Sequence, residues 1–258
     1  MNRILITGGN GYIAKTLVKN LGTKYSIYAV SRKDFDLEDY FATQKWFQGK
    51  HFDLVIHTAS AGTRNPRDSN PEILNKNIMM FVNLLAVKGS YKKLINLCSG
   101  ASIFLPETPY GASKKITASL ASKYDWIYTL RIFGLFDENE RPDRFIKGNI
   151  LRYIRHQPIL VYENKIMDFF YSKDLASMIE YCIRDDNAPR LIDCSYVIQP
   201  SLLDMAIFIN SLGSHSVPIN FSGNNVKDYK GNSWLPINTI GLFLGIEMTY
   251  EQLRRKTI

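Results

Sequence analysis

The chain has 258 residues and a formal net charge of +8, and 45% of its residues are hydrophobic and 22% charged. This composition is that of a globular protein, and no apolar run is long enough for a membrane span, so we expect no membrane partner. Lysines and arginines are dispersed along the chain, which argues against a nucleic-acid partner. A phosphate-bearing small molecule accounts equally well for the positive charge.

The three cysteines, Cys98, Cys182 and Cys194, lie in separate apolar stretches. Their odd number and their spacing favour buried thiols over a disulfide framework or a metal site. The apolar run at the start of the chain lacks the flanks of a signal peptide. We therefore predict a cytoplasmic protein without a bound metal.

The first fourteen residues combine an apolar strand, a glycine cluster and a helix. Arg3–Ile6 is a short apolar run, Tyr12–Leu21 has helical apolar spacing, and Gly8, Gly9 and Gly11 lie between them. In a strand–turn–helix unit, such glycines permit a tight turn and let a pyrophosphate approach the helix N-terminus, although the same glycines also occur in ordinary tight turns. The residues predicted to contact cofactor phosphates here are Gly8, Asn10, Gly11, Tyr12 and Ile13.

The end of the second expected strand, Tyr25–Arg32, indicates which dinucleotide is bound. An acidic residue there would accept hydrogen bonds from a ribose 2′-hydroxyl, whereas an arginine pairs with a 2′-phosphate. The strand ends in Ser31-Arg32-Lys33, and no acid occurs before Asp34. We therefore predict NADP, with NAD as the second choice and a solvated basic loop as the alternative. The residues assigned to this end of the cofactor are Ser31, Arg32, Asp36 and Leu37.

The following segments alternate between helix and strand patterns. A helix is expected over Tyr40–Gln48 and another over Leu74–Val87, with strands in Phe52–Ala61 and Lys93–Cys98. Continuous apolar strands that alternate with helices predict an α/β fold with a doubly wound, Rossmann-like parallel sheet. His57 lies inside a strand and is expected to be packed rather than catalytic. The small residues after that strand that a cofactor could pass are Ala59, Ser60 and Ala61.

A tyrosine and a lysine share one face of the helix expected over Pro109–Ser122. Tyr110 and Lys114 are four residues apart, which is one helical turn. A neighbouring ammonium favours the phenolate form of a tyrosine, so the pair can exchange a proton with a substrate oxygen. A chain of this composition contains about one such spacing by chance, so its position after the glycine turn and after Ser99 carries the interpretation.

Several motifs in order resemble the extended short-chain dehydrogenase/reductase family. They are TGGNGYIA, DLVIHTASA, Asn77 at the start of NIMMFVNLLAV, Ser99, YGASK, LRIFGLF and DFFYSKDLA, and they extend to about residue 195. More narrowly, the chain resembles the NAD(P)-dependent nucleotide-sugar epimerases, dehydratases and 4-ketoreductases of that family. The resemblance implies a catalytic set of Ser99, Tyr110 and Lys114, with Ser102 as the next candidate for the serine. It also implies cofactor contacts at Asn77, Tyr110, Lys114 and Phe133.

Departures from the family patterns narrow the expected reaction. The dehydratases carry an Asp-Glu pair after the catalytic residue, but Gly100-Ala101-Ser102 follows Ser99. The 3,5-epimerase/reductases use a Cys and a His, which are missing from the corresponding segments. We therefore expect NADPH-dependent reduction of a 4-keto, 6-deoxy nucleotide sugar, with Tyr110 as the proton donor. A 4-epimerase with tightly held NAD is the alternative, and a non-catalytic NADP-binding regulator is the alternative of another class.

The C-terminal part is expected to bind the substrate. We predict a cofactor-binding core over 1–136, to which 170–198 returns, and a substrate lobe formed by 137–169 and 199–258. Helices are expected over Phe145–His156, Asp174–Arg184, Ser201–Leu212 and Tyr250–Arg255, with Asp174 as an N-cap. The predicted substrate contacts are Ser102, Arg144, Lys147 and Lys165. The apolar helices that contain Asn77 and Tyr110 resemble a dimer face, so we expect a homodimer.

Overall fold

A computed structural model describes residues 3–62, 70–224, 226–232, 235 and 237–257. The chain forms two compact units. The first comprises Met1–Ile132 and Met178–Ile192, and the second comprises Phe133–Ser177 and Asp193–Ile258. The predicted division, with boundaries at residues 136, 169 and 198, differs from these units at each junction. The substrate-binding role of the second unit stays a prediction.

The first unit is organised around a parallel sheet. Within the described residues, this sheet has six strands in the order β2-β1-β3-β4-β5-β9, and each pairing from β2 to β5 is parallel. Its strands are β1 (Arg3–Thr7), β2 (Ser26–Val30), β3 (Phe52–His57), β4 (Tyr91–Ser99), β5 (Ile127–Ile132) and β9 (Leu191–Cys194). The last strand runs from the first unit into the second. The predicted doubly wound fold class is confirmed.

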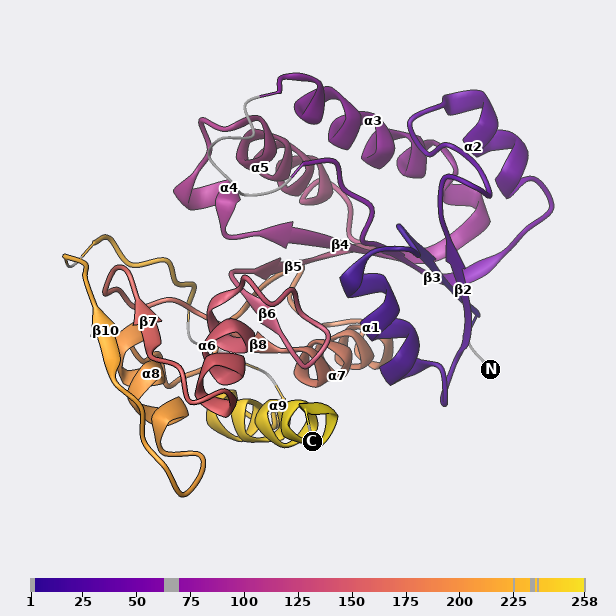
Figure 1. The fold of residues 1–258 in the computed structure, drawn as a ribbon. Coiled ribbons are helices and arrows are strands. Elements are labelled where there is room, and N and C mark those ends of the chain that lie inside the picture. Colours follow the sequence, from indigo (N-terminus) through magenta and orange to yellow (C-terminus); the bar gives the residue numbers. More distant parts are fainter. Residues whose placement is uncertain (1–2, 63–69, 225, 233–234, 236, 258) are drawn as a thin grey trace. The chain divides into compact units, whose positions relative to one another are not determined.

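Helices cover both faces of this sheet (Figure 1). They are α1 (Tyr12–Leu21), α2 (Tyr40–Phe47), α3 (Glu72–Ala86), a 3₁₀ turn η1 (Lys88–Ser90), α4 (Ala101–Phe104), α5 (Pro109–Ala121) and α7 (Ser172–Arg184). Helices α3 and α5 pack side by side over one face, and α1 lies on the other. Leu5, Val55, Leu94 and Ile127 form a buried row across four strands on the face that Phe81 of α3 covers.

Capping residues set where two of these helices begin. The Asp39 carboxylate accepts a hydrogen bond from the Ala42 N–H and starts α2. At α5, the Thr108 hydroxyl accepts from the Gly111 N–H at 3.0 Å, and Pro109 takes the first helical position. An N-cap hydroxyl followed by proline fixes the first turn of a helix. Tyr110 therefore lies in a turn whose start the sequence specifies.

The second unit contains short strands and longer helices. Its elements are β6 (Leu135–Phe136), α6 (Phe145–Ile154), β7 (Ile159–Val161), β8 (Phe170–Tyr171), α8 (Leu202–Asn210), β10 (Ile219–Phe221) and α9 (Leu242–Thr257). Strand β7 pairs with β10, and β6 pairs with β8, both in parallel. In the described part of the chain, no helix is both long enough and apolar enough to cross a bilayer.

The expected N-cap at Asp174 is wrong. Helix α7 begins at Ser172, and the buried Asp174 carboxylate instead accepts hydrogen bonds from the Ile240 and Gly241 N–H groups at 2.8 and 3.0 Å. These donors directly precede α9, which starts at Leu242. Asp174 therefore fixes the start of a helix more than sixty residues away along the chain. Helix α9 (Leu242–Thr257) is longer than the helix expected over Tyr250–Arg255 and begins earlier.

Candidate active site

The glycine turn lies where the strand order of the sheet reverses. Strand β1 has β2 on one side and β3 on the other, and a crevice at such a point accepts ligands in doubly wound sheets. Gly8 has a φ of +70°, and a Cβ there would lie 2.8 Å from the Ala59 Cα after β3. The Gly9 N–H donates to the Val30 carbonyl at 2.7 Å. The turn is therefore packed against the ends of both neighbouring strands.

The N-terminus of α1 fits the diphosphate of a dinucleotide. Its N-cap residue is Gly11, which has no side chain to cap the first N–H groups. These donors and the helix dipole favour an anion at this end of the helix. The structure thus places the predicted phosphate contacts Gly8, Asn10 and Gly11 together at the turn, while Tyr12 and Ile13 form the first turn of the helix. Their contact with a cofactor stays a prediction.

Substitution of Gly8 tests whether this glycine turn binds the cofactor. We expect Gly8→Ala to weaken NADPH binding by about tenfold or more, because the added Cβ would overlap the Ala59 backbone and distort the turn. Gly49→Ala is the matched control, since Gly49 has the same φ of +70° and no heavy atom lies within 4 Å of its added Cβ. Titration of NADPH fluorescence would measure both variants. Equal losses in the two variants would contradict a specific role for Gly8.

A tyrosine and a lysine of α5 lie next to the end of β4. Lys114 is buried, and its Nζ donates to the Leu97 carbonyl at 3.1 Å and lies 5.6 Å from the centroid of the Tyr110 ring. Tyr110 is partly exposed. Ser99 follows two residues after Leu97 as the last residue of β4, and its Oγ accepts from the Ala101 N–H at 3.2 Å. The three predicted catalytic residues thus belong to one strand end and the helix packed on it.

A buried amide ties this helix to the loop after β3. The Asn77 side chain accepts from the Ala61 N–H at 2.7 Å and donates to the Ala61 carbonyl at 3.1 Å and to the Ser113 Oγ at 2.9 Å. Ser113 in turn donates to the Tyr110 carbonyl at 2.7 Å. The sequence assigned Asn77, Ser60 and Ala61 to the cofactor, and in the structure Ser60 lies beside this same amide. Ser113 is a positioning residue that sequence reasoning missed.

His57 is a packed histidine, as expected. It is 4% exposed, and its Nδ1 lies 3.0 Å from the Thr7 Oγ. Burial, and to a smaller extent the charge of Lys114, lowers the pKa of His57 to about 3. The imidazole is therefore neutral near neutral pH, so it adds no second positive charge beside Lys114. This arrangement argues against a general-acid role for His57.

The segment after β2 holds the residues predicted to meet the adenosine end of a cofactor. Ser31 donates through its N–H and its hydroxyl to the Asp34 carboxylate, and the exposed Arg32 forms an ion pair with Glu38. The Asp36 carboxylate accepts from the Glu38 N–H at 3.0 Å, and Leu37 is buried. Arg32 thus lies at this edge as predicted, but its guanidinium is already paired with Glu38, a partner that the sequence pattern did not indicate.

The remaining predicted contacts lie in other surroundings. Ser102 is buried in α4. In the second unit, Arg144 pairs with Glu140 at 3.4 Å, Lys147 donates to the Glu140 carbonyl at 2.6 Å, and Lys165 pairs with Glu163. Phe133 also belongs to the second unit, where its ring contacts that of Tyr229. Among the described residues, no group of three or more His, Cys, Asp and Glu side chains could hold a metal ion.

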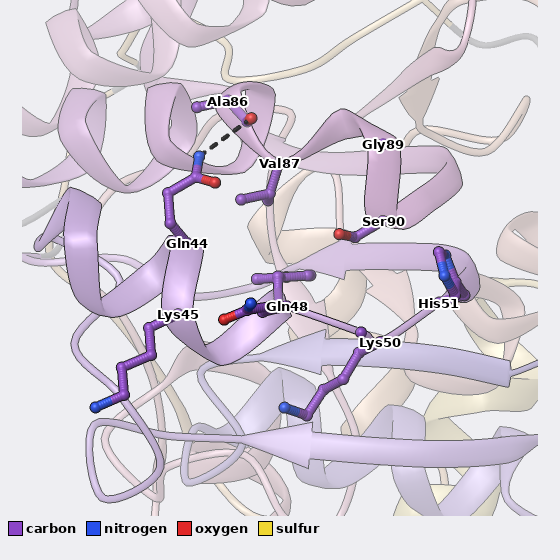
Figure 2. A pocket seen from close by; sticks show the side chains of 11 residues that line it. Gln44, Lys45, Gln48, Lys50, His51, Ala86, Val87, Gly89 and Ser90 are labelled. Carbon is purple, nitrogen blue, oxygen red and sulfur yellow. Dashed lines mark hydrogen bonds between the residues drawn. The ribbon is translucent and has the colours of Figure 1, made fainter.

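A surface hollow of about 450 Å³ lies at the opposite, amino-terminal edge of the sheet (Figure 2). It is bordered by the ends of α2 and α3. Two of its polar side chains donate hydrogen bonds to carbonyls of these helices. Gln44 donates to the Ala86 carbonyl at 3.2 Å, and Lys50 donates to the Trp46 carbonyl. Lys45 lies in the last turn of α2 and points away from the hollow. Cations at helix C-termini are favoured by the dipole, so these groups need no ligand.

Comparison with known proteins decides the family. The family model described as "NAD dependent epimerase/dehydratase family" matches residues 4–194. The chain belongs to this family. Membership confirms the resemblance seen in the sequence motifs and the prediction of an NAD(P)-dependent enzyme.

Individual relatives are distant but cover 84% or more of this chain. The CDP-abequose synthase of Yersinia pseudotuberculosis is 22% identical over 84% of this chain and 87% of its own length. The NADP-bound GDP-mannoheptose C4 reductase of Campylobacter jejuni is 17% identical with a TM-score of 0.80, covering 98% of both chains. The NAD-bound UDP-glucose 4-epimerase of Thermus thermophilus is 16% identical with a TM-score of 0.79, covering 99% of this chain and all of its own. These structures share the fold.

Proposed function

We propose that this protein reduces a 4-keto, 6-deoxy nucleotide sugar with NADPH. The observation that carries the proposal is the pairing of Tyr110 with the buried Lys114 beside the end of β4, in a member of the NAD dependent epimerase/dehydratase family. Two of its relatives are named as a CDP-abequose synthase and a C4 reductase of a GDP-linked sugar, which supports a nucleotide-sugar substrate. The nucleotide-sugar class, NADPH and the C4 position are part of the proposal.

In this mechanism Tyr110 and Ser99 act on the substrate carbonyl, and the other protein groups act through Tyr110 and its helix. Bound NADPH supplies the hydride that reduces the carbonyl carbon. The Tyr110 hydroxyl donates a proton to the oxygen on which negative charge develops. The Ser99 hydroxyl orients that oxygen by hydrogen bonding, and the Lys114 ammonium stabilises the negative charge left on the phenol. The Leu97 carbonyl and the Asn77–Ser113 bonds hold Lys114 and the first turn of α5 in place.

The segment after Ser99 supports reduction over dehydration. Elimination of water needs a positioned acid and base near the leaving hydroxyl. Ala101 and Ser102 open α4 directly after Ser99-Gly100, and neither residue ionises at neutral pH. The first carboxylate after Ser99 belongs to Glu107, beyond the end of α4. The proposed enzyme therefore transfers a hydride without eliminating water.

A substrate panel tests the proposal. We expect purified protein to oxidise NADPH in the presence of at least one 4-keto-6-deoxy nucleotide sugar and to bind NADPH more tightly than NADH. Loss of NADPH absorbance would follow the reaction. Interconversion of 4-epimers without consumption of added NADPH would identify the 4-epimerase instead. NADPH binding without turnover of any sugar in the panel would favour the regulatory protein.

Assembly and location also stay proposals. We propose a homodimer formed through α3 and α5, whose exposed surface includes Met79, Val82 and Ile116. Apolar side chains gathered on two adjacent helices favour a protein contact. A cytoplasmic location fits the three cysteines, which are all buried thiols.

A further inference from the structure

The residues that follow β2 hold an arginine and several acids on a short loop. Arg32 comes two residues after Val30, whose carbonyl accepts from the Gly9 N–H of the glycine turn. This is the position at which an arginine can meet the 2′-phosphate of NADP. The loop also contains Asp34, Asp36 and Glu38. The balance between these charges therefore determines how strongly the loop attracts a phosphate.

The aspartate carboxylates of this loop already accept hydrogen bonds from groups close to them in the chain. Asp34 accepts from the Ser31 N–H and hydroxyl, and Asp36 accepts from the Glu38 N–H. Asp39 at the end of the loop caps α2. Glu38 differs, because its carboxylate pairs with the Arg32 guanidinium. The side chain of Arg32 is 69% exposed and that of Glu38 22% exposed, so the pair lies at the surface with the acid partly covered.

A buried side chain of α3 holds the backbone at Glu38 in place. Asn83 of α3 is 2% exposed, and its Nδ2 donates to the Leu37 carbonyl at 2.9 Å and to the Glu38 carbonyl at 3.1 Å. Buried Leu37 anchors the same segment. Glu38 is therefore a positioned counter-charge and not a mobile side chain on a loose loop. A phosphate can take full advantage of Arg32 only when Glu38 releases it.

We propose that Glu38 sets the preference between NADPH and NADH by competing with the cofactor 2′-phosphate for Arg32. The inference rests on the NADPH use that the proposed function assigns. NADH has a 2′-hydroxyl and gains little from the guanidinium, so the competition penalises only the phosphorylated cofactor. Glu38 is thus a specificity-determining residue that lowers the affinity for NADPH in the wild-type protein.

Cofactor binding to single and double variants tests this inference. We expect Glu38→Gln to tighten NADPH binding about threefold to fivefold and to leave NADH binding within about 1.5-fold, in keeping with the modest strength of exposed ion pairs. The gain should shrink as salt concentration rises, because salt screens exposed charges. Arg32→Ala should weaken NADPH binding at least about tenfold, and Glu38→Gln should add no further gain in that background.

Asp186→Asn is the matched control. It removes an equal charge from an ion pair with Lys93, which lies near the start of β4 at the opposite edge of the sheet, and it should leave both cofactor affinities unchanged. A similar change in NADPH and NADH affinity on Glu38→Gln would show a structural role and overturn the inference. A full gain that persists with Arg32→Ala would show direct repulsion and also overturn it. Because the readout is fluorescence-detected binding, failure to turn over a keto-sugar would defeat the proposed function and leave this test intact.

Discussion

Replacement of Tyr110 by phenylalanine is expected to lower the rate of ketone reduction by about 10²- to 10⁴-fold, the usual contribution of a positioned general acid. The substitution removes one oxygen from a partly exposed ring and keeps the ring beside Lys114. We therefore expect the fold and the affinity for NADPH to change little. Turnover of a 4-keto nucleotide sugar and a separate NADPH titration would distinguish the loss of chemistry from a loss of binding.

Tyr124→Phe is the control for this experiment. Tyr124 is 39% exposed and lies just after the end of α5, away from Lys114, where its ring packs on Trp126. Its hydroxyl has no place in the proposed reaction, so turnover should stay at the wild-type level. Full activity of Tyr110→Phe would refute the role of Tyr110 as the proton donor. The NADPH-binding function of the glycine turn would remain open to the Gly8 test.

The second large effect is expected at Gly111, the residue after Tyr110. A Cβ at Gly111 would lie 1.8 Å from the Leu105 carbonyl oxygen and 2.7 Å from that of Ala101. Both contacts are to backbone, which cannot move aside as a side chain would. We expect Gly111→Ala to destabilise the protein by about 3 kcal/mol or more, and to impair turnover because α4 and α5 must separate next to Tyr110.

Gly89→Ala provides the comparison for Gly111→Ala. Gly89 lies in the 3₁₀ turn η1, its φ lies outside the left-handed region, and nothing is within 4 Å of its added Cβ. We expect its free energy of unfolding to stay within about 0.5 kcal/mol of the wild type. Denaturant titration of both variants would measure the difference. Equal stability of the two variants would contradict the close packing of α4 on α5.

Local patterns were sufficient to predict most of the first unit. Apolar runs of four to eight residues predict buried strands, and the spacing in Tyr12–Leu21 matches α1 from its first residue to its last. The helix that carries Tyr110 was predicted from its Pro109 start and ends one residue earlier than expected. These elements are specified by residues close together in sequence, which is why a single sequence suffices to place them.

Features that depend on distant residues were missed. The type and position of Asp174 suggest a local cap, but its carboxylate is bonded to N–H groups of Ile240 and Gly241. Strands β7 and β10 are only three residues each and exist because they pair with one another. At the candidate site, the motifs indicated Tyr110 and Lys114. The bond from Lys114 to Leu97 depends on tertiary packing, which spacing alone does not reveal.

That bond has a consequence for the energetics of ligand capture. A lysine that becomes ordered only on binding gives up roughly 1.5–2 kcal/mol of side-chain entropy, and this loss weakens the complex. The Leu97 carbonyl in β4 already restrains the Lys114 side chain in the ligand-free protein. Most of this entropy is therefore lost on folding and not on ligand binding. The ammonium is therefore preorganised, and a ligand that binds beside it does not have to order this side chain.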